Sequence, residues 1–418
     1  MSLKNNSLVY KLKTLASDSI LTIAALVIMN CVAQFVIYPL WSKVFGDEQY
    51  GNIIYVMSLV NIFAVSMGVS ANYARMVESA KHTTCNGDYN CMLCVCSLIE
   101  GVLCFGIILF SDLGMSALES GLAAVLAVLT MWRFYADVEY RLTLNFKGYF
   151  LYYMVISIGY GIGGFLFLKT KLWPLALIPG EVLGLTMVYV KGGIFRTHPL
   201  ARSDDFKANV KYTCVLTCSN IIDNLIFNGD RILLQIALNG ASVTLYYLAS
   251  LVGKTMSLIS TPLNSVIMGY LARYKGEFNR KTFFLILAGT LAAIVLATVA
   301  TVVGSHILIS LLYADSYLRV RDYFFIANLT QVIYFTTNVV TTILLRFAKV
   351  NFSLVVNSLY GIAFVVLCVP AAFLGGVDAF CVALLMVNIL RYLAAMGYCW
   401  FYFGKKSTKN IGEPQSDN

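Results

Sequence analysis

The sequence predicts an all-α membrane protein with about twelve transmembrane helices, and three observations lead to this fold class. The chain has 418 residues, of which 59% are hydrophobic and only 12% are charged, about half the share of charge found in soluble domains. Its apolar stretches are each about 20 residues long, the length that crosses a hydrocarbon core of about 30 Å. These stretches are continuous rather than alternating, which favours helices over a β-barrel because a helix satisfies its own backbone hydrogen bonds in lipid.

The apolar stretches follow one another with short connections. We expect the spans at residues 19–40, 50–72, 91–111, 115–136, 149–168, 173–190, 213–238, 244–270, 283–303, 323–345, 353–373 and 379–403. The longest connection, residues 191–212, is polar and lies in the middle of the chain. We interpret it as a cytoplasmic linker between an N-terminal six-helix lobe, residues 1–190, and a C-terminal six-helix lobe, residues 213–403. A cytoplasmic tail, residues 404–418, completes the predicted organisation.

The placement of positive charge predicts the orientation. When the N-terminus is taken as cytoplasmic and the spans alternate, only Lys43, Lys169, Lys171, Arg319 and Arg321 fall on the opposite side, out of 30 lysines and arginines. This is a positive-inside distribution, and it places both termini in the cytoplasm. The net charge of +9 therefore reflects orientation and anionic lipid, and not nucleic acid.

Two glycine patterns predict close helix packing. Gly159 and Gly163 share one predicted span, and Gly180 and Gly184 share the next. A small residue at every fourth position lets two membrane helices approach closely. The first pattern also matches a dinucleotide-binding motif by letter, but no strand precedes it, so we interpret it as packing.

Charges inside predicted spans are candidates for function, because a charge at the centre of a span costs about 2.5–3.5 kcal/mol on insertion scales. Asp223 and Asp230 are seven residues apart and share a helix face. Three asparagines at four-residue spacing lie nearby, and we expect this polar stripe to face a wet cavity. The candidates for ion coupling are Asp223, Asp230 and Glu100. The candidate cations within spans are Arg231, Lys254 and Arg391.

Several patches of the sequence together form a family pattern. They are Asn30, the run from Pro39 to Gly51, the run from Gly68 to Arg75, the run from Asp230 to Leu234, and Gly240, Tyr246 and Pro262. These patches resemble the Wzx-type polysaccharide-biosynthesis flippases of the multidrug/oligosaccharidyl-lipid/polysaccharide (MOP) exporter superfamily. The resemblance covers nearly the whole chain in layout and is specific only in these patches.

The resemblance implies two six-helix lobes around a central cavity, and a flippase that moves polyprenyl-diphosphate-linked oligosaccharides across the bacterial inner membrane for O-antigen, capsule or exopolysaccharide synthesis. The cavity would take an anionic cargo by alternating access. We expect Arg231 to grip phosphate through its planar fork of donors, with Lys254 and Arg391 adding positive potential. Arg75 is a further candidate for the diphosphate, and Asn30 belongs to the resembling pattern.

The expected partners are the lipid-linked oligosaccharide, membrane lipid and an ion gradient of H⁺ or Na⁺, with polysaccharide polymerase or assembly machinery as a further candidate. The sequence contains no phosphate-binding loop, so we do not expect ATP hydrolysis. We also predict no cofactor, metal site or catalytic residue. Two other classes stay open. A polysaccharide polymerase or ligase would be expected to carry a large extracytoplasmic loop, and a drug/cation antiporter of the same superfamily would favour an acidic cavity.

Overall fold

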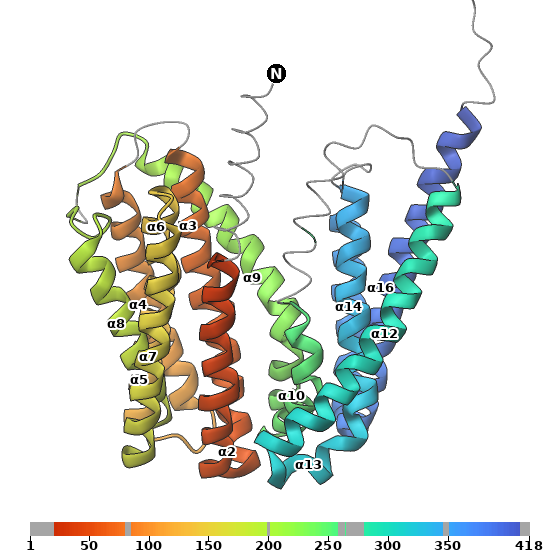
Figure 1. Cartoon of the computed structure of the whole chain (residues 1–418), viewed down its shortest axis with the longest axis horizontal. Helices are drawn as coiled ribbons and strands as arrows, with labels where there is room; N and C mark the ends of the chain where they lie inside the picture. Colours follow the sequence, from red (N-terminus) through yellow and green to blue (C-terminus); the bar gives the residue numbers. More distant parts are fainter. Residues whose placement is uncertain are drawn as a thin grey trace, which may run out of the picture. The chain divides into compact units, whose positions relative to one another are not determined.

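The computed structural model describes residues 21–79, 85–198, 201–257, 264, 280–345 and 351–409. Every regular element in these ranges is helical (Figure 1). Part of the predicted eighth span and residues 410–418 of the predicted tail lie outside the described residues, whereas residues 404–409 continue the last helix.

Six stretches of the described chain are long and apolar enough to cross a membrane. They are Leu21–Ser79, Asn86–Phe110, Ala117–Leu142, Phe146–Thr170, Arg280–Leu312 and Val355–Phe401. The first and last of them each cover two predicted spans. Gly46 has φ 72° and Gly376 has φ 65°, a backbone conformation that costs glycine little, and each glycine kinks its stretch between the two spans. A multi-pass helical membrane protein is therefore confirmed, while the number twelve and the side of the termini stay predictions.

Contacts divide the chain into two compact units, residues 1–232 and 233–418. Unit 1 holds α2 (Tyr38–Val60), α3 (Ser66–Ser79), α4 (Asn86–Phe110), α5 (Ala117–Ala136), α6 (Val138–Leu142), α7 (Phe146–Thr170), α8 (Ile178–Lys191) and most of α9 (Phe206–Ala237), with π-helical turns at Ala33–Ile37 and Asn61–Val65 and a 3-10 turn at Trp173–Ala176. Within it, α5 packs against α3, α4 and α8, and α7 packs along α8.

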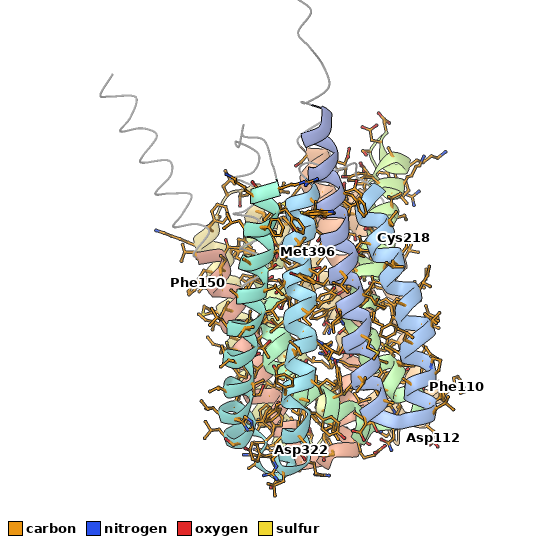
Figure 2. All side chains as sticks on the ribbon, turned by 90° about the vertical axis from the view of Figure 1, so that its right-hand side faces the viewer. Phe110, Asp112, Phe150, Cys218, Asp322 and Met396 are labelled. Carbon is orange, nitrogen blue, oxygen red and sulfur yellow. The ribbon has the colours of Figure 1, made fainter. Side chains whose placement is uncertain are left out.

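Unit 2 holds the end of α9, α10 (Gly240–Thr255), α12 (Arg280–Leu312), α13 (Ala314–Val320), a 3-10 turn at Arg321–Tyr323, α14 (Phe324–Leu345), α15 (Asn351–Ala363), a π-helical turn at Phe364–Cys368 and α16 (Val369–Lys409). Its centre is α14, which packs against α10, α12 and α16. Met396 of α16, labelled in Figure 2, belongs to a buried cluster with Val340, Leu344 and Tyr392. The boundary between the two units falls inside α9, which is one continuous helix.

The glycine patterns do pack as predicted. A Cβ added at Gly159 would lie 2.7 Å from the backbone nitrogen of Gly180, and a Cβ at Gly184 would lie 2.7 Å from Cγ1 of Ile156. These distances are shorter than real Cβ contacts, so α7 and α8 reach their separation only because these positions carry no side chain.

The polar link between the sixth and seventh predicted spans is fastened to unit 1. Asp88 accepts hydrogen bonds from the backbone nitrogen of Ser203 at 2.8 Å and from Nδ2 of Asn209 at 2.9 Å. Asn90 donates to the carbonyl oxygen of Ile194 at 2.9 Å, and Oε2 of Glu139 accepts from the backbone nitrogen of the same residue at 3.1 Å. The described part of this link is thus held by side chains of α4 and α6, while the predicted lobe boundaries stay a prediction.

Candidate functional site: buried charges in the membrane helices

Arg231 is buried near the unit boundary of α9, with 9% of its surface exposed. Its Nη1 lies 3.4 Å from Oγ of Ser58 in α2 and 3.3 Å from Oδ1 of Asn228. Both of these groups are neutral hydrogen-bond acceptors that help to orient the guanidinium. The neighbouring Asp230 carboxylate accepts from the backbone nitrogen of Arg231 at 2.9 Å.

Two asparagines of the α9 stripe have partners in α3. Nδ2 of Asn220 donates to Oγ of Ser70 at 2.8 Å, and Nδ2 of Asn224 donates to Oγ of Ser66 at 2.9 Å. The stripe therefore forms a polar seam between α9 and α3 inside unit 1, in which amides and hydroxyls hydrogen-bond one another. Both asparagines are half-buried, and the expectation that the stripe faces a wet cavity stays a prediction.

The two aspartates that share a predicted face of α9 differ in their surroundings. Asp230 is buried at 3% exposure, whereas Asp223 is exposed. Sequence spacing predicts that they lie on one side of the helix, but of the two only Asp230 is buried. The structure thus brings Asp230 next to Arg231 and leaves Asp223 apart from them along the helix.

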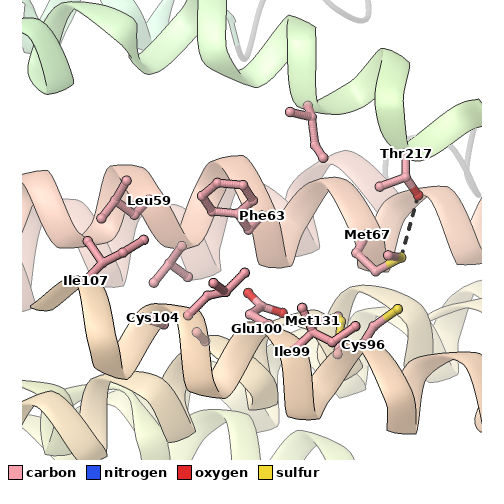
Figure 3. Close-up of a pocket in the computed structure, with 14 residues that line it drawn as sticks. Leu59, Phe63, Met67, Cys96, Ile99, Glu100, Cys104, Ile107, Met131 and Thr217 are labelled. Atoms are coloured by element: carbon pink, nitrogen blue, oxygen red, sulfur yellow. Dashed lines mark hydrogen bonds between the residues drawn. The ribbon is translucent and has the colours of Figure 1, made fainter. Parts of the chain in front are cut away.

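Glu100 lies on α4 and lines a cavity of about 200 Å³ in unit 1 (Figure 3). The other lining residues are almost all apolar or sulfur-containing, among them Leu59, Phe63 and Met67. Oε1 of Glu100 is buried and has no hydrogen-bond partner among the described residues. The hydroxyl of Thr217, on the α9 side of the cavity, donates to Sδ of Met67 at 3.5 Å. Glu100 is therefore the most isolated of the three predicted ion-coupling carboxylates.

The remaining predicted contacts of unit 1 already have protein partners. Nη2 of Arg75 donates to Oδ1 of Asn86 at 2.8 Å, and its guanidinium lies 5.9 Å from the ring centroid of Tyr89. Nδ2 of Asn30 donates to the backbone oxygen of Leu26 at 2.9 Å. Arg75 thereby links the end of α3 to the start of α4, and a cargo contact by Arg75 or Asn30 stays a prediction.

The two cations of unit 2 lie beside the same central helix. Lys254 is buried at the end of α10, with 7% of its surface exposed, and a Cβ on the preceding Gly253 would meet Gln331 of α14. Arg391 of α16 reaches Asn338 of α14, where Nη2 donates to Oδ1 at 2.9 Å. Positions 331 and 338 share one face of α14, about 10 Å apart along its axis. Arg231 belongs to unit 1, whereas Lys254 and Arg391 belong to unit 2.

One buried ion pair was not anticipated from the sequence. Nε of Arg133 in α5 lies 2.7 Å from Oε2 of Glu181 in α8, and the hydroxyl of Tyr160 in α7 donates to Oε1 of Glu181 at 2.7 Å. The charge count placed Arg133 among the cytoplasmic cations, whereas only 5% of its surface is exposed. The available signal was Glu181, a carboxylate inside a predicted span that required a cationic partner.

Other clusters give no further site. Among the described residues, no group of three or more histidine, cysteine, aspartate or glutamate side chains could hold a metal ion. Cys91 is buried and Cys94 is exposed, and Nη2 of Arg202 lies 3.5 Å from Sγ of Cys91. Cys91 is therefore part of the packing between α4 and the polar link, whereas Cys94 lies at the surface.

The arrangement of kinked and packed helices has counterparts among solved structures of membrane proteins. The structure is similar to a lipid II flippase MurJ in an inward closed conformation, with a TM-score of 0.68, 13% identity and coverage of 95% of this chain and 91% of that one. It is also similar to an inward-facing multidrug resistance MATE family transporter of the MOP superfamily, with a TM-score of 0.65, 12% identity and coverage of 94% and 100%. A MOP superfamily transporter from Pyrococcus furiosus matches with a TM-score of 0.59, 13% identity and coverage of 92% and 94%. At these identities the likeness shows the fold alone, which this chain shares with the three solved structures.

The family follows from the sequence itself. A family model described as polysaccharide biosynthesis protein matches residues 44–322, and the chain belongs to this family. A search of curated proteins found no match. The resemblance to polysaccharide-biosynthesis flippases with the MOP fold is thereby confirmed at the level of family and fold.

Proposed function

We propose that this protein is a flippase that moves polyprenyl-diphosphate-linked oligosaccharides across the bacterial inner membrane for O-antigen, capsule or exopolysaccharide synthesis. One observation carries the proposal: a member of the polysaccharide biosynthesis family with a transporter fold buries cations in its membrane helices, namely Arg231, Lys254 and Arg391. A buried cation is costly in lipid and is retained where it serves function. An anionic cargo fits this charge.

The proposed mechanism is alternating access. Arg231 contacts the diphosphate through its guanidinium, which the neutral groups of Ser58 and Asn228 hold in place. Lys254 adds positive potential. The sugars travel in a cavity shielded from the bilayer while the prenyl tail stays in lipid, and no covalent bond of the cargo breaks.

An ion gradient supplies the energy in this proposal. Among Asp223, Asp230 and Glu100, the strongest candidate is Glu100, because its Oε1 is buried in an apolar cavity without a hydrogen-bond partner among the described residues. A carboxylate in such a place is stabilised strongly by a bound cation or proton.

A complementation experiment tests the proposal. In a strain that lacks its own copy, the wild-type gene should restore surface polysaccharide. Arg231→Ala should abolish it and Arg231→Lys should restore part, since lysine keeps the charge but loses the planar fork. Membrane abundance of each variant is measured in parallel, and Arg321→Ala, outside the buried set, is the matched control. Normal polysaccharide from an abundant Arg231→Ala variant would remove this arginine from the mechanism, and failure of the wild type would refute the flippase proposal.

A drug/cation antiporter is the second candidate, and one observation favours it. The Glu100 cavity combines an apolar lining with a carboxylate, which suits a lipophilic cation. Overexpression should then raise resistance to lipophilic cationic dyes. Unchanged dye resistance together with restored polysaccharide would exclude this candidate.

A further inference from the structure

Arg391 occupies a compact setting built by three helices of unit 2. Its Nη2 donates to Oδ1 of Asn338 in α14 at 2.9 Å and to Oδ1 of Asn357 in α15 at 3.2 Å. Its guanidinium carbon lies 4.7 Å from the ring centroid of Tyr334 and 5.3 Å from that of Tyr360. Two amide oxygens and two aromatic faces therefore fix the orientation of the guanidinium.

These four neighbours neither neutralise the charge of the Arg391 guanidinium nor accept hydrogen bonds from all of its N–H groups. All of them are neutral, and no carboxylate of the described residues forms an ion pair with Arg391. Its Nε and Nη1 are buried without a hydrogen-bond partner, and only 6% of the residue is exposed. A guanidinium cannot lose its charge by deprotonation in a protein, so a counter-ion is the remaining way to balance it.

A cavity lies directly beside this arginine. It has a volume of about 300 Å³, at the lower end of the range of ligand pockets, and it lies between α15 and α16. Arg391 and Tyr360 are its polar lining residues, whereas Val387, Leu390 and Leu393 give it an apolar wall. Leu390 and Leu393 are themselves 47% and 57% exposed, so the wall continues onto apolar surface that suits lipid.

This combination selects an amphiphile with one oxyanion. The single cation matches the oxyanion, and the leucine and valine wall matches a hydrocarbon chain attached to it. A sugar or a hydrated ion would leave the apolar wall uncovered. Hydrocarbon without a charge would leave the guanidinium uncompensated.

The position of Arg391 along the membrane narrows the source of the ligand. Arg391 is twelve residues from each end of the predicted span 379–403, about 18 Å along the helix in either direction. The predicted span thus places Arg391 at mid-depth in the bilayer, where headgroups of ordinary phospholipids do not reside. A lipid phosphate that is carried across the membrane must pass this depth.

We infer that Arg391, Asn338, Asn357 and the cavity between α15 and α16 form a binding site for the phosphate of a polyprenyl carrier lipid. The phosphate accepts hydrogen bonds from the guanidinium of Arg391, and the first isoprenoid units lie against Val387, Leu390 and Leu393. The choice of carrier lipid over bilayer phospholipid rests on the proposed flippase function, whereas the lipid-phosphate site itself does not.

Binding by the purified full-length protein tests this inference. The protein, delipidated in detergent, is titrated with a polyprenyl phosphate, with phosphatidylglycerol and with inorganic phosphate, and bound ligand is counted by native mass spectrometry. Three variants are compared with the wild type. Arg391→Gln removes the charge, Arg391→Lys keeps it without the planar fork, and Asn338→Asp places a carboxylate 2.9 Å from Nη2 with almost no change in shape.

Asn338→Asp is the decisive variant, because it neutralises the site from inside while supporting the helix packing. It should melt no lower than the wild type and should weaken binding of polyprenyl phosphate about 10- to 100-fold, as expected for a lost charged hydrogen bond. Arg391→Gln should show the same loss and Arg391→Lys a smaller one. Arg321→Gln, which removes an exposed arginine of unit 2, should bind like the wild type.

Each result decides the inference. Equal polyprenyl phosphate binding by the wild type and Asn338→Asp would overturn it and would leave Arg391 as a tie between helices. Wild-type binding of phosphatidylglycerol as tight as that of polyprenyl phosphate would keep the lipid-phosphate site and overturn the carrier assignment. Failure of the wild type to restore surface polysaccharide would refute the flippase proposal without changing these binding curves, so the two failures are distinguishable.

Discussion

The contact between α7 and α8 yields a prediction whose size can be worked from the structure. Gly159→Ala would place a Cβ 2.7 Å from the backbone nitrogen of Gly180, whereas ordinary contacts begin at 3.4 Å. The neighbour is backbone and cannot swing aside, so the two helices must separate by most of an ångström. Overpacking of this kind costs about 1–3 kcal/mol.

Gly161→Ala is the matched control, because it lies on the same helix and its Cβ would meet nothing within 4 Å. Both substitutions gain the helix preference of alanine over glycine, about 1 kcal/mol, so the difference between the variants isolates the steric cost. At about 2–4 °C for each kcal/mol in a unit of this size, Gly159→Ala should melt about 2–12 °C below Gly161→Ala.

The measurement is a melting curve of the purified full-length protein in detergent, read as the monodisperse fraction that survives heating. Membrane abundance of the two variants gives a second readout with the same expected order. If Gly159→Ala melts at the same temperature as Gly161→Ala or above it, then α7 and α8 do not make this contact, and the close-packing interpretation of both glycine patterns is wrong.

Three further changes test other parts of the structure. Asp88→Asn removes the charge of the acceptor that holds the polar link, which costs about 1.5–3 kcal/mol for hydrogen bonds to a charged group. It should therefore speed tryptic cleavage between residues 191 and 211. Asp112→Asn, a control at an exposed aspartate, should leave the cleavage rate unchanged. Replacing either Arg133 or Glu181 by methionine should destabilise unit 1 by about 3–5 kcal/mol because the partner stays charged and buried, whereas the double replacement should melt above both single variants; additive losses would contradict the pairing. Glu100→Gln should strongly lower gradient-driven transport in proteoliposomes at unchanged abundance, and transport at the wild-type rate would exclude Glu100 from coupling.

The sequence predicts the membrane helices and some residues of the candidate site, but it does not predict the partners of those residues. Continuous apolar runs determine membrane spans because lipid allows only elements that satisfy their own backbone. The spacing of Gly159 and Gly163 predicts a close helix contact, since small residues let membrane helices touch. Hydropathy also marked Arg231, Lys254 and Arg391 as buried cations, because charges within apolar runs stand out.

The partners of those charges depended on which helices meet. Helical spacing predicts Asp223 and Asp230 on one face, yet packing buries only Asp230. Two asparagines of α9 donate to serines of α3, and spacing along the chain does not predict these partners. Arg133 counted as a surface cation until α8 brought Glu181 to it.

What the sequence by itself determined is the solvent of this protein, its helical fold class and its family, because these follow from composition and local pattern. What only the tertiary structure decided is which polar groups are satisfied by protein and which are left for a ligand. Glu181 and Arg391 look alike in sequence, as single charges in apolar spans. Packing gives Glu181 an arginine and a tyrosine and gives Arg391 only neutral neighbours beside a cavity, because the compensation of a buried charge depends on side chains that are distant along the chain.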